Sequence, residues 1–368
     1  MPNFKALCVV WVSVVVAALA QSPLGVVIDH EPAGSGRYIG SPSLAILSNG
    51  TYVASHDLFG PNSGEIKSGI TRIFVSKDKG KSWQQTAELQ DQFWSTLFVY
   101  RRQLYLMGTS AEYGRIVIRR ASDNAADWSP PSFITTDAGY HTAPVPMVEK
   151  NRRLWRAFEY HPAGPWGHFE ALMISAPVMA DLLKPESWKM TDRLPYPTEL
   201  SEGQTWLEGN AVLAPDGFVL DILRVHNLEK AATLRVLNDE RLHFEGLTNF
   251  PGGAKKFTIR FDPQTKLYWT LANPASSDNP LSATDPAAVR NVLSLLSSPD
   301  LINWHTEHIV LTHPDHIHNA FQYVDWQFAG RDIVFVSRTA FEAERAHDAN
   351  YLTFHKLEDF RMHKREDQ

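Results

Sequence analysis

Short runs of apolar and aromatic residues alternate with turn residues along most of the chain, and this pattern predicts β-strands. In the first clear case, Ser43–Leu47 and Thr51–Ser55 flank the sequence Ser48-Asn49-Gly50. Asn-Gly accepts the positive φ angles of a tight turn, so this segment is predicted to form a β-hairpin. Five similar pairs of runs follow: Leu97–Tyr100 with Gln103–Met107, Val145–Val148 with Leu154–Phe158, Asn210–Leu213 with Phe218–Leu223, Phe257–Phe261 with Leu267–Leu271, and Phe321–Val324 with Ile333–Ser337.

These hairpins recur with a period of about 58 residues, and two more strand-like runs follow each of them. Four antiparallel strands per repeat, arranged radially, predict an all-β propeller of six four-stranded blades. The run Gly25–Asp29 is expected to close the ring as the outer strand of the last blade, next to a third strand at Asn350–Phe354. Two stacked β-sandwiches are the alternative, although no linker or change of composition divides the chain.

A turn motif supports the propeller. Ser76–Trp83 reads Ser-Lys-Asp-Lys-Gly-Lys-Ser-Trp and fits the Asp-box pattern Ser-x-Asp-x-Gly-x-x-Trp, which lies between the third and fourth strands of sialidase-type blades. In such a box the Ser and Asp oxygens accept bonds from turn amides, and Gly takes a conformation that other residues resist. Degenerate copies lie at Ala121–Trp128 and Ser297–Trp304. These boxes stabilise turns and identify the scaffold, not the chemistry.

The first twenty residues are predicted to be a signal peptide. Lys5 supplies a positive charge, Ala6–Val16 a short apolar core, and Ala18-Leu19-Ala20 a cleavage site before Gln21. We therefore expect residues 21–368 to form a single propeller domain that is secreted or periplasmic, exported in the bacterial manner, without a stable membrane span in the mature chain. Cys8, the only cysteine, lies in the signal, so a cysteine nucleophile, a disulfide and a Cys-zinc site are excluded.

Composition narrows the function classes. The 368 residues include 35 Lys and Arg against 41 Asp and Glu, for a net charge of -6, which argues against a nucleic-acid partner. The 11 Trp, 11 Tyr and 19 Phe are spread along the whole chain, and aromatic residues at this density suit both pleated strands and clefts that bind sugars.

Polar residues gather at one end of the predicted hairpins, where the first strand starts and the second ends. The opposite turns carry ordinary turn residues. Titratable groups converging on one face are typical of an active site. The residues at second-strand ends are His56, Asp57, Glu159, Arg224, Asn273 and Arg338, and those near first-strand starts are Tyr140, His141, Trp206, Glu208, Lys255, Lys256 and His318.

Further candidates lie near the same face. His347 and Asp348 are expected in the pocket because they precede the third strand of the last blade. His316 and His318 could hold a divalent ion if both point to one side of a strand, and a structural calcium ion is a possibility, but no metal or cofactor motif stands out. The tryptophans that could stack on sugar rings are Trp94, Trp155, Trp166 and Trp206.

The segments SPSLAILSNGTYVASHDLFGP, SKDKGKSW, FWSTLFVYRRQLYLMGTS, WLEGNAVLAPDG and HDANYLTFH resemble the sialidase-like (BNR/Asp-box) propellers of bacterial polysaccharide degraders. Within that group the chain resembles the rhamnosidases, ulvan lyases and rhamnose–glucuronate lyases. The resemblance implies that His56 acts as a base or acid. Where a second histidine is expected, the chain reads Phe93-Trp94-Ser95, so His141 would have to replace it. Those lyases have seven blades, which leaves seven as the alternative to six.

Two reaction types remain open. A lyase needs a base, for which His56 or His141 is available, with Tyr140 as the acid and Arg224, Arg338 or Lys255 neutralising the uronate carboxylate. A hydrolase would use a pair of carboxyl groups, for which Glu159 and Glu208 are available.

A retaining sialidase needs three arginines, a Tyr nucleophile with a Glu base, and an Asp acid. Its first arginine belongs to an Arg-Ile-Pro motif, whereas this chain reads Arg37-Tyr38-Ile39 with the arginine displaced, which weighs against strict sialidase activity.

We therefore expect an enzyme that cleaves an acidic, uronate-containing oligo- or polysaccharide. Elimination at a rhamnosyl-1,4-glucuronate linkage is the first expectation. A glycoside hydrolase of the rhamnosidase or exo-sialidase type, or a non-catalytic glycan-binding propeller, is the alternative. The residues expected to bind substrate are Asp57, Trp94, Trp206, Arg224, Lys255, His318, Arg338, His347 and Asp348, and those expected to be catalytic are His56, His141, Tyr140, Glu159 and Glu208.

Overall fold

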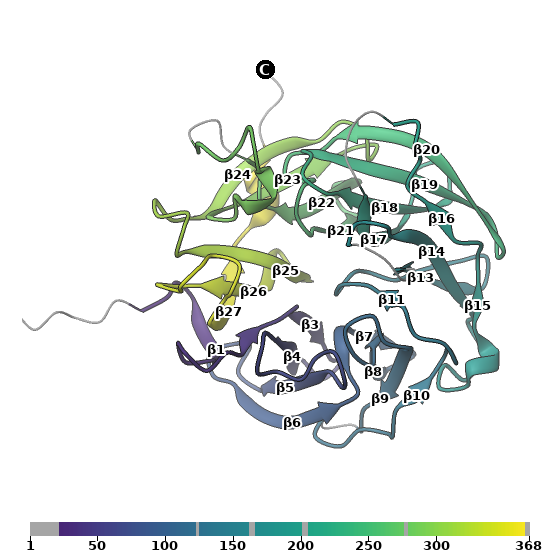
Figure 1. Cartoon of the computed structure of the whole chain (residues 1–368), viewed down its shortest axis with the longest axis horizontal. Helices are drawn as coiled ribbons and strands as arrows, with labels where there is room; N and C mark the ends of the chain where they lie inside the picture. Colours follow the sequence, from purple (N-terminus) through teal and green to yellow (C-terminus); the bar gives the residue numbers. More distant parts are fainter. Residues whose placement is uncertain (1–21, 123–124, 162–165, 201–204, 276–278, 365–368) are drawn as a thin grey trace, which may run out of the picture.

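The structure is a computed structural model that describes residues 22–122, 125–161, 166–200, 205–275 and 279–364. Within these ranges the strands form six antiparallel sheets, arranged as blades around a central axis and followed by the chain in one circuit (Figure 1). The prediction of a six-bladed all-β propeller is therefore confirmed, and the sandwich and seven-bladed alternatives are not.

Each blade has four strand positions from the axis outward, and blades 1 and 3 contain strands broken into two pieces. Blade 1 contains β2 (Tyr38–Ile39), β3 (Ser43–Ile46), β4 (Tyr52–Phe59), β5 (Ile70–Ser76) and β6 (Gln84–Gln90). Blade 2 contains β7 (Phe93–Tyr100), β8 (Gln103–Thr109), β9 (Ile116–Arg120) and β10 (Ser132–Phe133). Blade 3 contains β11 (Tyr140–His141), β12 (Val148–Lys150), β13 (Arg153–Tyr160), β14 (Glu170–Pro177), β15 (Lys189–Met190) and β16 (Leu194–Pro195).

Blade 4 contains β17 (Trp206–Leu213), β18 (Val219–Val225), β19 (Lys230–Asn238) and β20 (Arg241–Asn249). Blade 5 contains β21 (Thr258–Asp262), β22 (Leu267–Ala272), β23 (Val292–Ser298) and β24 (His305–Thr312). Blade 6 contains β25 (Ala320–Ala329), β26 (Asp332–Ala340), β27 (Tyr351–Leu357) and β1 (Val26–His30). The helices of the described ranges are the short 3-10 turns η1 (Pro185–Ser187), η2 (Pro286–Ala288) and η3 (Phe360–His363).

The ring closes as the sequence predicts. β1 pairs antiparallel with β27 and places Val26 opposite Phe354, so the N-terminal strand completes the last blade (Figure 1). The Asp29 side chain then reaches into blade 1, where its Oδ2 accepts a bond from Arg72 Nη1 at 2.9 Å. The two ends of the circuit are thereby joined by backbone pairing and by an ion pair.

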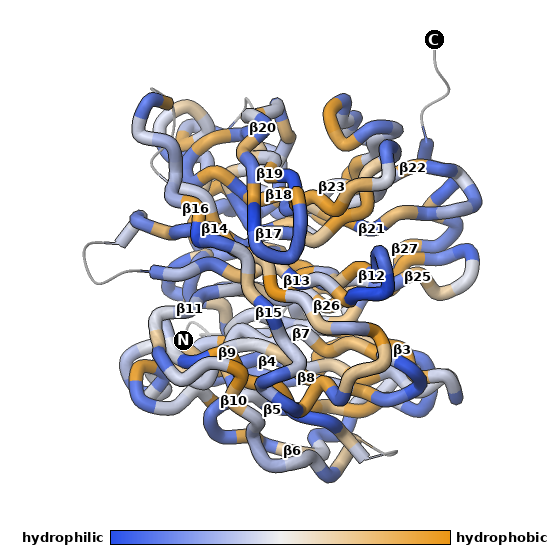
Figure 2. Tube along the Cα trace, turned by 90° about the vertical axis from the view of Figure 1, so that its right-hand side faces the viewer, coloured by the Kyte–Doolittle hydropathy of each residue, from blue (hydrophilic) through white to orange (hydrophobic). Residues whose placement is uncertain are grey.

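The hydrophobic core consists mainly of the layers between neighbouring blades. Between blades 3 and 4, for example, Trp155, Phe169, Trp206 and Leu223 pack in one buried cluster, and similar clusters join the other neighbours. Edge-on, Figure 2 shows hydrophobic stretches along strands such as β23 and hydrophilic stretches at turns on the rim. Middle strands such as β4 and β18 are buried along almost their whole length, which is what a sheet covered on both faces by other sheets requires.

Around the axis, polar side chains of first strands accept hydrogen bonds from the backbone of another blade. Such side-chain to backbone bonds satisfy buried amides that no neighbouring strand pairs. The four bonds run from Leu97 N to Ser43 Oγ (2.9 Å), Val145 N to Thr96 Oγ1 (3.0 Å), Ile259 N to Asn210 Oδ1 (3.0 Å) and Leu44 N to Asp325 Oδ2 (2.9 Å).

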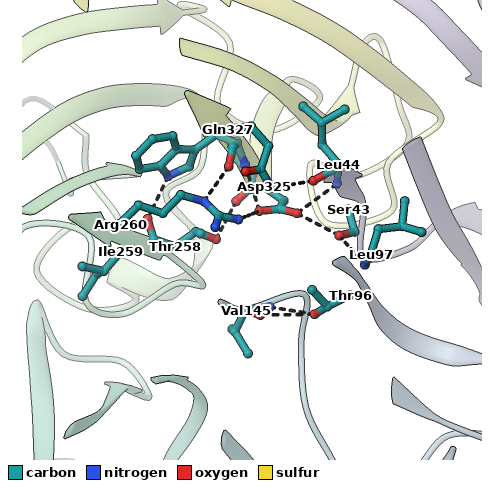
Figure 3. Close-up of polar contacts among 12 residues, drawn as sticks. Ser43, Leu44, Thr96, Leu97, Val145, Thr258, Ile259, Arg260, Asp325 and Gln327 are labelled. Atoms are coloured by element: carbon teal, nitrogen blue, oxygen red, sulfur yellow. Dashed lines mark hydrogen bonds and ion pairs between the residues drawn. The ribbon is translucent and has the colours of Figure 1, made fainter. Parts of the chain in front are cut away.

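Asp325 is the centre of this network (Figure 3). Its Oδ2 accepts bonds from Ser43 Oγ and Leu44 N of blade 1, and its Oδ1 pairs with Arg260 Nη2 of blade 5 at 3.1 Å. One buried carboxylate on blade 6 therefore binds both of its neighbouring blades.

All three Asp-box segments lie between the third and fourth strands of their blades, as predicted. In each, the Trp indole N–H donates to a backbone carbonyl three residues earlier, and that residue has positive φ. The pairs are Trp83 with Gly80 (3.2 Å), Trp128 with Ala125 (3.3 Å) and Trp304 with Leu301 (3.2 Å). The third box keeps Ser298 two residues before Asp300 and shortens the loop that follows.

The predicted signal peptide and its cleavage site before Gln21 lie outside the described residues. Among the residues that the structure describes, none belongs to a helix with the length and apolarity that a membrane crossing needs.

Candidate active site

A cavity of about 400 Å³ opens on the face where first strands start and second strands end, the face that the sequence indicates. All six blades contribute to its wall, through their inner strands or through the loops between their second and third strands. The lining residues include Asp57, Phe59, Glu65, Trp94, Glu112, Tyr113, His141, Trp166, Glu208, Arg224, His226, Arg290, Tyr323, Arg338 and His347.

Three lining residues occupy equivalent, strained positions. Trp94, Glu208 and Tyr323 lie in the first strands of blades 2, 4 and 6, where the pairing with the second strand is interrupted by a bulge. Their φ angles are +46°, +60° and +55°. A non-glycine residue in this region costs about 1 kcal/mol or more. The bulge ends the regular alternation of the strand and lets these side chains enter the cavity.

Glu208 and Tyr323 form a hydrogen-bonded pair. The Tyr323 hydroxyl donates to Glu208 Oε1 at 2.9 Å, and Arg224 Nε donates to Glu208 Oε2. Burial by itself would raise the pKa of Glu208, but Arg224, His141 and Tyr323 hold it below its ordinary value. Burial and the Glu208 charge raise the pKa of Tyr323. The pair thus joins an ionised carboxylate to a protonated phenol.

Three arginines surround this pair. Arg224, Arg290 and Arg338 all line the cavity, and the guanidinium groups of Arg290 and Arg338 lie 5.7 Å and 4.8 Å from the Tyr323 ring centroid. Burial lowers the pKa of Arg338 to about 10, which keeps it charged at neutral pH. Only one of the three, Arg224, is neutralised by a direct salt bridge to a lining carboxylate. Arg290 and Arg338 are therefore lining cations without an ion pair to a lining carboxylate, although Asp57, Glu65 and Glu112 also lie in the wall.

Asp57 is the carboxyl group with the most unusual environment in the cavity. It is 1% exposed, and neither carboxyl oxygen has a hydrogen-bond partner. Burial raises its pKa to about 7, although the nearby His56 and Arg338 charges act in the opposite direction. A carboxyl group that is partly protonated at neutral pH can donate a proton.

A histidine–carboxylate pair forms another part of the wall. His141 Nδ1 lies 2.8 Å from Oε2 of the fully buried Glu159, and the His141 ring packs edge-on against Trp94 with centroids 4.4 Å apart. Because an ionised carboxylate only accepts, Nδ1 carries the proton and the tautomer of His141 is fixed.

The structure brings part of the predicted site together. Trp166, half exposed, also lines the cavity, as the sequence suggested. The predicted site residues that line it are Asp57, Trp94, His141, Glu208, Arg224, Arg338 and His347. Those that do not are His56, Tyr140, Glu159, Trp206, Lys255, His318 and Asp348.

His56, the expected base, is fully buried between blade 1 and β1. Its Nε2 lies 2.8 Å from Asp29 Oδ2 and its Nδ1 lies 2.9 Å from the Asp57 carbonyl oxygen. Both ring nitrogens are therefore occupied by acceptors. The backbone alternation of β4 sends His56 to one side and Asp57 to the other, so the neighbouring residue reaches the cavity instead.

Tyr140 also points away from the cavity. Its hydroxyl accepts a bond from Arg193 Nη2 at 2.8 Å, and its ring lies in the core between blades 2 and 3. Trp206 is fully buried in the core between blades 3 and 4.

The remaining predicted residues support the wall or lie outside it. Lys255 Nζ bonds Glu229 Oε1 and the Pro286 carbonyl oxygen, and so holds η2 close to Arg290. Asp348 accepts a bond from His347 Nδ1 at 2.9 Å, behind the lining. The side chain of His318 is 49% exposed and pairs with Asp315.

Sequence reasoning missed several lining residues, above all Tyr323 and Arg290. Tyr323 lies in a predicted strand, and nothing in its neighbours signals the bulge that turns it inward. Arg290 follows η2 in a connection between strands that carried no motif. Arg37, displaced from the sialidase pattern, is 40% exposed at its side chain and pairs with Glu31 outside the cavity.

Among the described residues, no group of three or more His, Asp or Glu side chains is arranged to hold a metal ion. The His316–His318 pair considered from the sequence therefore has no third ligand of these types in the described ranges.

Known proteins are similar to this chain in three-dimensional structure. No protein-family profile and no curated protein matches the sequence. A Trypanosoma rangeli sialidase in complex with 2,3-difluorosialic acid is similar with a TM-score of 0.61 and 10% identity, over 91% of this chain and 59% of that one. An α-L-arabinanase from Penicillium chrysogenum has a TM-score of 0.56 and 11% identity, over 91% and 97% of the two chains.

A Dyadobacter fermentans protein of unknown function is similar as well, with a TM-score of 0.62, 13% identity and coverage of 91% and 98%. At such identities the likeness shows a shared propeller fold alone. The expected sialidase-like architecture fits these neighbours, whereas the resemblance to rhamnosidases and polysaccharide lyases is not shown by them.

Proposed function

We propose that this protein is a retaining glycoside hydrolase that removes a carboxylate-bearing sugar from an acidic glycan, with Tyr323 as its nucleophile. The observation that carries the proposal is the hydrogen bond between Tyr323 and Glu208 within a ring of three arginines. Two of the structural neighbours are named as a sialidase and an arabinanase, which agrees with a carbohydrate-active enzyme at a coarse level.

In the first step, Glu208 Oε1 takes the proton of the Tyr323 hydroxyl while the phenolate oxygen attacks the anomeric carbon. A neutral phenol approaches an anionic sugar with less Coulomb repulsion than a carboxylate would. Arg224 holds the other oxygen of Glu208, so the carboxylate faces the hydroxyl.

Asp57 supplies the proton that the leaving group needs. With its pKa raised to about 7 by burial, Asp57 donates to the glycosidic oxygen and then takes a proton from the water that hydrolyses the tyrosyl intermediate. Asp57 lines the cavity, and neither of its carboxyl oxygens has a hydrogen-bond partner among the described residues.

The arginines explain the proposed substrate class. Arg290 and Arg338 line the cavity beside the nucleophile and would pair with a carboxylate of the sugar, as guanidinium groups do through paired hydrogen bonds. The substrate is therefore a sialoside or uronide of an acidic oligo- or polysaccharide.

Elimination, the first expectation from the sequence, has less support in the geometry. Of its expected groups, His56 and Tyr140 do not line the cavity, although the alternative base His141 does. The proposed nucleophile Tyr323, its base Glu208 and the acid Asp57 all line it. We also propose that the chain is exported, secreted or periplasmic, after cleavage near Gln21. N-terminal sequencing of protein recovered from a producing cell tests that proposal.

The experiment uses aryl glycosides of sialic acid, glucuronic acid and arabinofuranose with the wild type and Tyr323→Phe. We expect release of the aryl group from an acidic sugar and at least a 1,000-fold loss of kcat in the variant. Tyr268→Phe is the matched control, because the Tyr268 hydroxyl bonds the Leu213 carbonyl oxygen on the opposite face.

A derivative of the accepted sugar with fluorine on the anomeric carbon and on the carbon next to it should form a covalent bond to Tyr323 with loss of fluoride. A peptide containing Tyr323 should then gain the mass of the derivative less that of HF. Full activity of Tyr323→Phe would refute the proposed nucleophile. An unsaturated sugar among the products would show elimination instead. Sugar binding without turnover would indicate a glycan-binding propeller.

A further inference from the structure

The wall between blades 3 and 4 contains a buried carboxylate that the proposed displacement does not use. Glu159 on β13 is fully buried. Its Oε2 pairs with His141 Nδ1, and its Oε1 accepts a bond from the Gly209 backbone N–H at 2.8 Å. Gly209 directly follows Glu208, so one carboxylate connects a lining histidine to the backbone that carries the proposed base.

The backbone at Glu208 needs such a partner. Pairing of β17 with β18 is interrupted between Leu207 and Asn210, and Glu208 has a φ of +60°. The Gly209 N–H is thereby left without a strand partner, and an unpaired buried amide costs roughly 1–3 kcal/mol. Glu159 satisfies this amide by a hydrogen bond to a charged group, which is stronger than a neutral one.

The other side of this segment is also fixed. A Cβ atom on Gly209 would collide with Oδ1 of Asp221, so the chain at 209 has no room for a side chain. The Asn210 side chain donates to the Glu208 carbonyl oxygen at 3.3 Å. Glu208 is therefore presented by a short backbone segment that is held from two sides, with Glu159 as the contact from the neighbouring blade.

We propose that Glu159 is a positioning residue, which by accepting the Gly209 N–H fixes the Glu208 carboxylate against the Tyr323 hydroxyl and at the same time orients His141. It acts through the reach of its side chain and does not touch the substrate. This inference rests on the proposed function for its kinetic consequence, while the positioning of Gly209 can be measured without it.

Two substitutions separate the effect of side-chain length at position 159 from the effect of its charge. Glu159→Gln keeps the length and an oxygen for Gly209 but removes the charge, whereas Glu159→Asp keeps the charge and withdraws both oxygens. If Glu159 positions Glu208, kcat falls less than about tenfold in Glu159→Gln and about 100-fold in Glu159→Asp, with KM changed less than about threefold in both. Glu159→Asn, short and neutral, should match Glu159→Asp.

The control is Glu149→Gln, a change of the same type on β12 of the same blade, outside the cavity lining. Thermal unfolding of every variant shows whether the fold is intact. Equal or greater activity of Glu159→Asp than of Glu159→Gln would overturn the proposal, because charge would then matter more than reach. Wild-type activity in all three variants would overturn it as well.

Hydrogen exchange of the Gly209 amide gives a readout that needs no turnover. Protection should persist in Glu159→Gln and fall at least tenfold in Glu159→Asp and Glu159→Asn. If the wild type hydrolyses no glycoside but protection follows this order, the proposed function fails and the positioning stands. If the wild type is active but protection is equal in all variants, the positioning fails and the function stands.

Discussion

Burial makes two aspartates of blade 1 chemically different. Asp78, in the exposed Asp box, accepts bonds from Ser82 and Ser76 that lower its pKa to about 2. Asp57 is buried without a bond to either carboxyl oxygen, and burial raises its pKa to about 7. The same side chain is thus an anion in the turn at neutral pH and a partly protonated group in the cavity.

The pH dependence of activity follows from Asp57. Because the proposed acid must be protonated, kcat/KM of the wild type should fall as pH rises above about 7. Asp57→Asn should lower kcat by roughly 100- to 10,000-fold and remove that limb of the profile. Initial rates between pH 4 and 9 test this, and an unchanged alkaline limb in the variant would exclude Asp57 as its origin.

The buried Asp57 carboxyl should also lower the free energy of unfolding at neutral pH. The folded pKa of about 7 lies above the ordinary 3.8, so the folded state loses stability as pH rises from about 4 to about 7, by an amount on the order of 4 kcal/mol. Asp57→Asn removes this penalty. Urea unfolding at pH 4 and pH 8 should show a larger gain for the variant at pH 8, and an equal difference at both would contradict the prediction.

At the scale of elements, turns and bulges set the positions of the strands. Gly80 in the Asp box has a φ of +90°, and a Cβ there would collide with the Phe354 ring of blade 6. Gly50 in the first hairpin has a φ of +85°, but a Cβ there would meet nothing within 4 Å. The two glycines share a backbone conformation and differ in their surroundings.

Gly50→Ala should therefore cost about 1 kcal/mol of unfolding free energy, the backbone penalty alone. Gly80→Ala should cost about 2–4 kcal/mol, because the box and the interface between blades 1 and 6 must shift. Chemical denaturation of both variants measures the difference. Equal costs would show that the box does not transmit strain to Phe354.

The bulges explain why the strand pattern and the site pattern diverge. In the first strands of blades 2, 4 and 6, a regular ladder would leave the strained residues in the pleat, whereas the bulge turns Trp94, Glu208 and Tyr323 toward the axis. Strain of this kind clusters at functional sites because the surrounding sheet can hold it.

At the scale of the whole molecule, stability depends on closing the ring. β1 covers the edge of β27, and Asp29 binds His56 and Arg72 of blade 1. Without β1 the last blade exposes an unpaired strand edge, which favours aggregation.

A chain that begins at Ser22 keeps β1 and serves as the reference for thermal unfolding. A chain that begins at Glu31, which lacks β1, should melt at least 10 °C lower or fail to accumulate in soluble form. Thermal unfolding and the soluble yield of the two chains test whether β1 stabilises the ring. Equal melting temperatures would show that β1 is dispensable for closure.

The sequence by itself determined the strands, the turns, the blade count and the face on which the cavity opens, because each depends on residues close together in the chain. Asn49-Gly50 specifies its hairpin locally, and the period of the repeats specifies the ring. The closing role of β1 was also predictable, since six repeats leave one strand missing from the last blade.

Only the tertiary structure decided which side chains meet. Tyr323 and Glu208 lie on different blades, and Arg290 arrives from a loop, so no spacing along the chain signals their contact. The sequence placed His56 and Asp57 together at a strand end, but the direction of the pleat decided that Asp57 reaches the cavity and His56 does not. Contacts of this kind depend on bulges and on burial, which arise only when the blades close around the axis.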